Sequence, residues 1–384
     1  MLSIALEIQL VAVVVAVACA LPGVFLVLRR MALMSDAISH TVLLGIVLAF
    51  FVTRDIGSPL LMVGAAATGV LTVALVELLR RTGLVREDTS IGLVFPALFS
   101  IAVLLIARFA GNVHLDTDAV LLGEIAFAPF RRLEVGGYDL GPRTLYVMGS
   151  ILVLELAVIA AFYKELKLST FDPALAAALG FSPVLLHYAF MGLVSIAAVG
   201  AFDAVGSILV VALMIAPPAA AYLLSDRLAV VLVLSAGLAA LAALAGFWIA
   251  WWVDASIAGC MAVAAGAIFM GALLFAPERG LLALALRRHR QRYDFAQLML
   301  TIHLLQHEGT STAARESSER HLGEHLRWTP EFAQRVVRDA AKTGWIDRGA
   351  DGRLRLTGAG RSAAVGTLGE TAPVGNAGRD EWQP

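Results

Sequence analysis

Nine stretches of mostly apolar residues constrain the fold of this chain more than any other feature. An α-helix needs about 20 apolar residues to cross a bilayer. A non-helical segment exposed to lipid would leave its backbone N–H and C=O groups without hydrogen bonds there. Since 59% of the 384 residues are hydrophobic and only 15% are charged, we predict an all-α polytopic membrane protein with eight or nine spans. The second and sixth stretches are short, so eight spans with a re-entrant segment are an alternative. The stretches are 6–28, 36–51, 59–79, 91–107, 144–162, 184–200, 205–224, 228–252 and 256–275.

Basic residues in the connecting loops predict the orientation of the spans. Arg29–Arg30, Lys164–Lys167 and the 279–292 cluster fall on alternate loops. If nine spans place these loops in the cytoplasm, the N-terminus lies outside and the C-terminus inside. Arg131 and Arg132 lie on a predicted outer loop and count against this scheme, although that loop is the longest, where the rule is weaker.

Three residues inside the apolar stretches carry separate predictions. Pro217 and Pro218 interrupt the seventh stretch and should break its hydrogen-bond ladder. Glu155 lies in the middle of the fifth stretch. We interpret it as a buried carboxyl group that is hydrogen-bonded to a neighbour, rather than as a group on a transport pathway.

The second stretch contains an aspartate and a histidine four positions apart, Asp36 and His40. On a helix these side chains share one face, about one turn from each other. A carboxylate and an imidazole placed in this way can bind one divalent cation. The spacing is equally compatible with a neutral pair that is hydrogen-bonded inside a helix bundle.

The segment 169–183 predicts a short helix on the cytoplasmic side. Asp172 is suited to cap the helix and Pro173 to begin it. Gly180 is suited to end it, and Pro183 prevents its continuation. A short helix of this kind is either a plain connector or the part by which a membrane domain contacts a soluble motor.

Five segments, in this order, resemble metal-specific ATP-binding-cassette permeases, the bacterial membrane subunits that import manganese, zinc or iron. The resemblance covers roughly residues 5–280, which lie within the predicted transmembrane permease domain, residues 1–286. The segments are RRMALMSDAISHTVLLGIVLAF, EDTSIGLVFPALFS, NVHLDTDAVLLGEIAFAP, STFDPALAAALGF and AVGSILVVALMIAPPAAAYLL.

The resemblance implies a homodimer of permeases in the bacterial inner membrane, with a cytoplasmic ATPase subunit and an extracytoplasmic metal-binding lipoprotein as partners. It assigns a metal site on the translocation path to Asp36 and His40. It implies a coupling segment that binds the ATPase, with Phe171, Asp172, Pro173, Ala176, Ala177 and Gly180. Apart from the resemblance, weaker metal candidates are His114, Asp116 and Asp118 on the predicted outer loop and Asp203 between the sixth and seventh stretches. The alternatives are a solvated polar loop for the first three and a polar group satisfied within the bundle for Asp203.

The chain is not expected to be an enzyme. It contains no G-x-x-x-x-G-K-[ST] segment, so ATP hydrolysis would belong to a partner chain. Mn²⁺, Zn²⁺ or Fe²⁺ would be cargo, and no permanently bound cofactor is expected. Two alternatives are an ion-gradient-driven secondary metal carrier and a membrane-tethered metal-responsive regulator; against the carrier, we find no convincing internal repeat.

The C-terminal residues predict a small cytoplasmic α+β domain at 293–366, followed by a disordered tail at 367–384. Three helices and a two-stranded hairpin resemble the winged-helix domain of diphtheria-toxin-repressor-like regulators. We expect a regulatory or protein-binding role rather than DNA binding, because the excess of basic residues is small. The expected buried face of the first helix consists of Phe295, Leu298, Met299, Ile302 and Leu305.

Two histidine pairs in this domain have the i, i+4 spacing of helical metal ligands. They are His303 with His307, and His321 with His325. A speculative reading makes them a regulatory metal site, and chance placement on solvated helix faces is the alternative.

Overall fold

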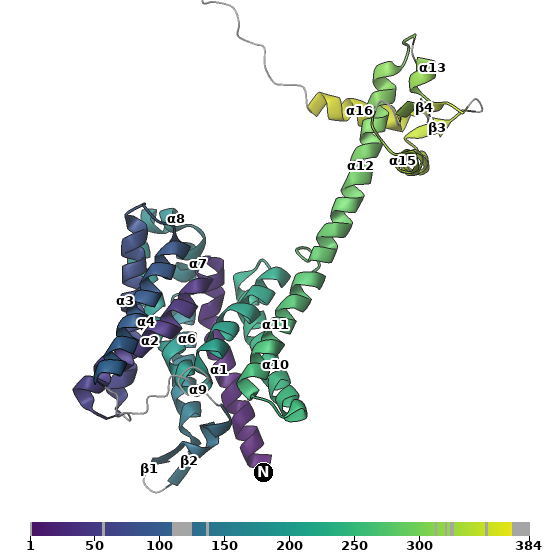
Figure 1. Cartoon of the computed structure of the whole chain (residues 1–384). Helices are drawn as coiled ribbons and strands as arrows, with labels where there is room; N and C mark the ends of the chain where they lie inside the picture. The colour runs from purple at the N-terminus through teal and green to yellow at the C-terminus, as the bar shows by residue number, and fades with distance from the viewer. Residues whose placement is uncertain are drawn as a thin grey trace, which may run out of the picture. The chain divides into compact units, whose positions relative to one another are not determined.

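The computed structural model describes residues 2–55, 58–109, 125–135, 138–311, 313–318, 321–322, 326–349 and 352–370. The chain divides into two compact units, Met1–Leu281 and Leu282–Pro384. The first unit is a bundle of long helices with small elements at its two ends (Figure 1). The division lies close to the end of the predicted permease domain at residue 286.

Eight helices among the described residues are long and apolar enough to span a membrane, which confirms the prediction of a polytopic helical protein. Their length follows from the uninterrupted apolar stretches of the sequence. They are α1 (Leu2–Leu28), α2 (Ala32–Thr53), α3 (Pro59–Arg81), α4 (Glu87–Phe109), α6 (Arg143–Ala161), α9 (Pro183–Leu224), α10 (Leu228–Val253) and α11 (Ile257–Phe275).

Helix α9 combines the sixth and seventh apolar stretches. Its 42 residues would be about 63 Å long as one straight helix, roughly twice the thickness of the hydrocarbon layer. The helix is interrupted at Gly206, whose φ of 77° and ψ of 167° are not helical. Glycine adopts this region easily because it has no Cβ atom.

The first half of α9 runs antiparallel to α3. Gly69 of α3 lies against Ser195, where an added Cβ would be 2.6 Å from the serine Oγ atom. About two turns closer to the start of α3, Met62 lies beside Gly200. The first half of α9 therefore ends at the side of the bundle where α3 begins.

The second half of α9 returns to the opposite side. Met214 and Pro218 lie against Gly23, near the end of α1, and an added Cβ at Gly23 would be 2.1 Å from the Met214 carbonyl oxygen. The chain thus reverses at Gly206, and the two halves of α9 run in opposite directions through the bundle. Pro217 and Pro218 lack the N–H donors of the hydrogen-bond ladder, but α9 stays helical through both, and the non-helical residue is Gly206.

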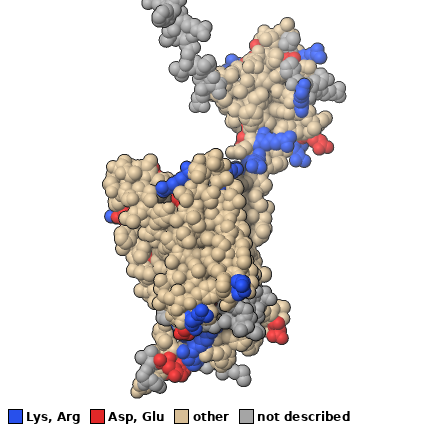
Figure 2. Space-filling view, turned by 60° about the vertical axis from the view of Figure 1, so that its left-hand side comes forward, with Lys and Arg blue, Asp and Glu red and all other residues tan. Residues whose placement is uncertain are grey.

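Small elements cover the two ends of the first unit (Figure 1). At one end lie the 3-10 helix η1 (Ile125–Phe130) and an antiparallel hairpin of β1 (Arg132–Val135) and β2 (Tyr138–Pro142). At the other end lie α7 (Tyr163–Phe171) and α8 (Pro173–Ala178). Charged residues gather at these ends, and the surface between them is almost free of charge on the face shown in Figure 2. Such a band suits contact with lipid.

The second unit consists of one long helix, α12, and shorter helices around its own apolar core. It contains an antiparallel pair of strands in which Ile346 is opposite Leu356, as the predicted hairpin requires. Its core includes Leu300, Leu322 and Val336. Its described elements are α12 (Leu281–His307), α13 (Ala313–Glu316), α15 (Pro330–Lys342), β3 (Ile346–Arg348), β4 (Leu354–Leu356) and α16 (Gly358–Glu370).

Two predictions about this unit need correction. Helix α12 buries Ala296, Leu300 and Leu304, whereas Phe295 and Met299 of the predicted face are exposed. Both faces carry apolar residues, so periodicity alone favoured the wrong one. The predicted disordered tail from residue 367 overlaps the last turn of α16, which continues to Glu370; the rest of the tail lies outside the described residues.

Candidate metal path and coupling surface

Asp36 and His40 lie together on α2, one turn apart, as their spacing predicts. The His40 Nε2 atom is 3.4 Å from Asp36 Oδ1. The imidazole also lies beside Phe95 and Phe99 of α4, with ring centroids 5.4 and 6.0 Å away. One side of the imidazole is therefore covered by the two aromatic rings, and the Asp36 carboxylate lies next to the imidazole.

These two side chains are partly exposed although they belong to a membrane-spanning helix. The side chain of Asp36 is 42% exposed and that of His40 is 27% exposed. The residues next to them on α2, such as Ser35 and Ser39, are fully buried. Ionisable side chains in membrane spans are costly and almost always face the bundle interior, a polar cavity or a partner, which suits this partly exposed pair.

The short helix α8 is built as the sequence predicts. Asp172 Oδ1 accepts a hydrogen bond from the Leu175 amide at 2.9 Å, and Pro173 occupies the first turn. Gly180 ends the segment with a φ of 88°, a conformation that favours glycine. The local signals therefore determine both ends of this helix.

The exposed surface around α8 is apolar, and sequence reasoning identified only part of it. Ala177 is exposed, but Ala176 is completely buried and cannot contact another protein directly. Large exposed apolar side chains lie within eight residues of Ala177 in the sequence, and the sequence interpretation did not include most of them. The exposed set is Phe171, Leu175, Leu179, Phe181, Val184 and Leu185; we call these six residues the α8 patch.

Arg29, at the end of α1, holds the segment before α8 in place. Its Nε atom donates to Thr170 Oγ1 at 3.1 Å, and its Nη2 atom donates to Ser169 Oγ at 3.2 Å. The guanidinium also lies 5.0 Å from the centre of the Phe190 ring. Burial lowers the pKa of Arg29 to about 10, so the group stays charged at neutral pH.

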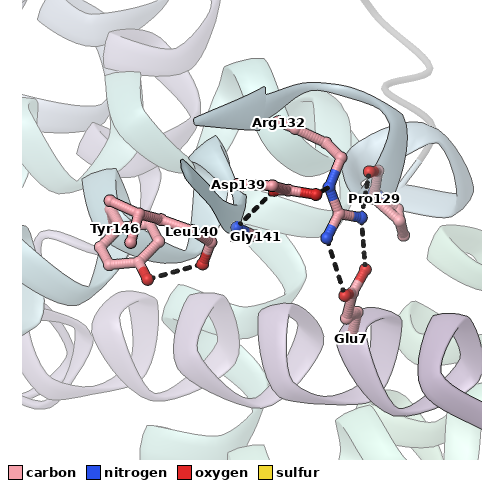
Figure 3. A network of polar contacts seen from close by, with 7 residues as sticks. All are labelled: Glu7, Pro129, Arg132, Asp139, Leu140, Gly141 and Tyr146. Carbon is pink, nitrogen blue, oxygen red and sulfur yellow. Dashed lines mark hydrogen bonds and ion pairs between the residues drawn. The ribbon is translucent and has the colours of Figure 1, made fainter. Parts of the chain in front are cut away.

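A second polar network ties the start of α1 to the β1–β2 hairpin at the opposite end (Figure 3). Arg132 donates to both carboxylate oxygens of Glu7 at 3.4 Å and also pairs with Asp139. The hydrogen bond from Arg132, helped by the Gly141 amide, holds the pKa of Asp139 below its usual value. The ion pair between Arg132 and Glu7 therefore attaches the hairpin to α1.

Among the weaker metal candidates, only Asp203 belongs to the described residues, and it does not join Asp36 and His40. Asp203 pairs with Arg131 at 3.3 Å beside the hairpin, at the opposite end from Asp36. The other three candidates lie outside the described residues; they are His114, Asp116 and Asp118.

Glu155 differs from the prediction. It is completely buried in α6, but neither carboxyl oxygen has a hydrogen-bond partner among the described residues. The expected hydrogen bond to a neighbour is therefore absent from that part of the chain.

In the second unit, the structure brings three of the four predicted histidines around one carboxylate. His303 and His307 lie together, and Glu316, which the sequence interpretation had not included, lies beside them. His321 contacts the same carboxylate. His325 lies outside the described residues.

Comparison with known proteins places the membrane unit in a family. The ABC 3 transport family matches residues 1–276, nearly the whole first unit. The chain belongs to this family. The predicted family of the membrane domain is thereby confirmed, and with it the role of a membrane transport subunit. The match ends before the second unit, whose resemblance to a winged-helix domain stays a prediction.

Individual relatives agree with this assignment. The zinc transport system membrane protein TroD of Treponema pallidum is 50% identical over 94% of this chain and 98% of its own length. The manganese transport system membrane protein MntD of Bacillus subtilis is 49% identical over 72% of this chain and 93% of its own. The solved structure of PsaBC from Streptococcus pneumoniae in complex with Fab has a TM-score of 0.61 at 28% identity, covering 73% of this chain and 94% of that chain.

Proposed function

We propose that this chain is the permease subunit of an ATP-driven importer for a divalent transition metal, manganese, zinc or iron. The observation that carries the proposal is the partly exposed Asp36–His40 pair inside a spanning helix. Carboxylate and imidazole ligands suit all three metals, so this pair does not select among them. Relatives named for zinc and for manganese are about equally similar to the chain.

The transport path lies between two copies of the chain. One copy leaves the Asp36–His40 face of α2 open, and a second copy in the same membrane would enclose it in a polar cavity. Symmetric dimers are the commonest oligomers, and a path on the symmetry axis would receive one ligand pair from each copy. Four such ligands can replace much of the water that a divalent ion loses on entry.

The α8 patch binds the ATPase subunit in the cytoplasm. Apolar side chains gathered at the end of a membrane domain are typical of a protein contact. Arg29 connects this patch to α1, so movement of α8 on ATP hydrolysis would reach the bundle through a short polar link. The hairpin end then faces outward and receives metal from an extracytoplasmic binding lipoprotein, in the bacterial inner membrane.

The second unit is a cytoplasmic winged-helix-like domain with a regulatory role. Its antiparallel strand pair and separate core support this reading. The match to MntD covers nearly all of that relative but only 72% of this chain, which supports a transport step that does not require the second unit.

Metal uptake in cells tests the proposed path. Asp36→Asn and His40→Ala should each abolish uptake, because each removes a ligand from both copies, while membrane insertion stays normal. Ser35 is buried on the same helix and points away from the pair, so Ser35→Ala serves as the control. Normal uptake by either well-expressed ligand variant would remove the pair from the path.

A further inference from the structure

The end of α12, the short helix α13 and His321 beyond it bring four potential ligands together in the second unit. The ligand atoms of His303, His307 and Glu316 all lie within 4.8 Å of one another. His303 Nε2 is 3.4 Å from Glu316 Oε2, and His321 Nε2 is 3.1 Å from Glu316 Oε1. Gly309, with a φ of 80°, allows the chain to turn back after α12 and return Glu316 to the histidines.

The cluster is buried. The side chains of His303, Glu316 and His321 are 6%, 9% and 12% exposed. An ionised carboxylate in such a place is unfavourable unless a cation or metal accompanies it. His307 is only half-buried, at the end of α12, and leaves a route for an ion to enter.

We propose that His303, His307 and Glu316 bind one divalent transition-metal ion, and that His321 positions the Glu316 carboxylate. Tetrahedral ligands at the usual zinc distances of 2.0–2.1 Å are about 3.3 Å from one another. The His303–Glu316 separation of 3.4 Å is close to this value, and the ligand atom of His307 lies within 4.8 Å of the other two. Two imidazoles and a carboxylate, with water as the fourth ligand, favour Zn²⁺ among the metals considered.

This site is separate from the transport path, which uses Asp36 and His40 in the first unit. It also differs from the sequence interpretation, in which each histidine pair would bind metal by itself. His303 and His307 remain ligands, but Glu316 joins them and His321 acts through that carboxylate. Metal bound here would link the last turn of α12 to α13, so the conformation of the second unit would depend on the cytoplasmic metal concentration.

A Co²⁺ titration of the full-length protein in detergent tests the site. The starting protein carries Asp36→Ala and His40→Ala, so that the membrane pair does not contribute, and is first stripped with a chelator. Co²⁺ in a tetrahedral nitrogen–oxygen site gives visible absorption bands. We expect one Co²⁺ per chain, displaced by Zn²⁺. Glu316→Gln or His307→Ala should weaken binding at least 100-fold, and His321→Ala by about 10- to 100-fold, as for other groups that orient ligands.

His289→Ala is the matched control, because it removes an exposed imidazole from the same helix, away from the cluster. Equal affinity in the His289 and His307 variants, or no Co²⁺ bound by the starting protein, would overturn the proposal. If Glu316→Gln disturbs folding, the Co²⁺ affinity of His307→Ala alone tests the proposal, since replacing a half-buried side chain should leave the fold intact. Uptake by the unaltered protein is measured separately, so failure of this site and failure of the transport path are distinguishable.

Discussion

Replacing Arg29 by alanine should loosen the segment that carries the α8 patch. The guanidinium makes two hydrogen bonds to Ser169 and Thr170 and lies over the Phe190 ring. Hydrogen bonds to charged groups contribute about 1.5–3 kcal/mol each and a cation–π contact about 0.5–2 kcal/mol. Because burial opposes the charged form and lowers the pKa of Arg29 to about 10, we expect a net loss below the sum, about 2–4 kcal/mol.

Amide hydrogen exchange of the full-length protein in detergent measures this loss locally. A decrease of about 2–4 kcal/mol in the free energy of opening corresponds to exchange roughly 30- to 700-fold faster. The increase should be confined to α7 and α8, since Arg29 contacts Ser169 and Thr170 there. If α8 binds the ATPase, co-purification of the ATPase should fall in parallel.

Two further variants make the result specific. Arg30→Ala removes the same charge from the next position, whose side chain is exposed, and should leave exchange in α7 and α8 unchanged. Arg29→Lys keeps the charge but loses the planar donor pair, so its exchange should be intermediate. Equal exchange in the Arg29 and Arg30 alanine variants would refute the reasoning.

Two other predictions concern the ends of the membrane unit. Ala177→Arg should release the ATPase in a pull-down without lowering the melting temperature, because Ala177 is exposed. Ala176→Arg should instead unfold the buried side of α8. Retained ATPase binding in Ala177→Arg would place the docking site elsewhere. The lowered pKa of Asp139 stabilises the hairpin above the ordinary aspartate pKa of about 3.9, and this contribution is lost as the pH falls through the lower folded value. Exchange in β1 and β2, corrected for intrinsic rates, should therefore be constant from pH 8 to 5 and rise only below about pH 3.9. In Arg132→Ala, exchange should already be faster at neutral pH and the rise below about pH 3.9 should be smaller, because the main cause of the lowered pKa of Asp139 is gone.

Local signals in the sequence were sufficient where a few neighbouring residues determine the structure. The α8 helix is the clearest case, since its cap, first turn and terminating glycine are encoded within Asp172, Pro173 and Gly180. The Asp36–His40 pair is a second case, because helix geometry alone brings residues four apart onto one face.

The remaining features depend on packing between distant segments. Positions 176 and 177 are both alanine, and only the packing of α8 shows that Ala176 is buried and Ala177 is exposed. Glu316 joins the histidines across a turn, so no helical period includes it. The sequence separated the sixth and seventh apolar stretches near this point, but it did not identify Gly206 as the residue whose non-helical conformation reverses α9.

Glu155 offers a test that separates the ATP-driven importer from an ion-coupled carrier. Its two carboxyl oxygens are buried in α6 without a hydrogen-bond partner in the described part of the chain. Leaving such a group unsatisfied costs about 1–3 kcal/mol, so Glu155→Met, which has a similar length and is apolar, should raise the melting temperature in detergent. Glu155→Gln keeps the buried polar atoms and should give no such gain. In an ATP-driven importer, metal uptake should survive both changes, because the energy comes from a partner chain. A carrier that moves a proton through this carboxyl would lose uptake in both, and that result would reinstate the ion-coupled alternative.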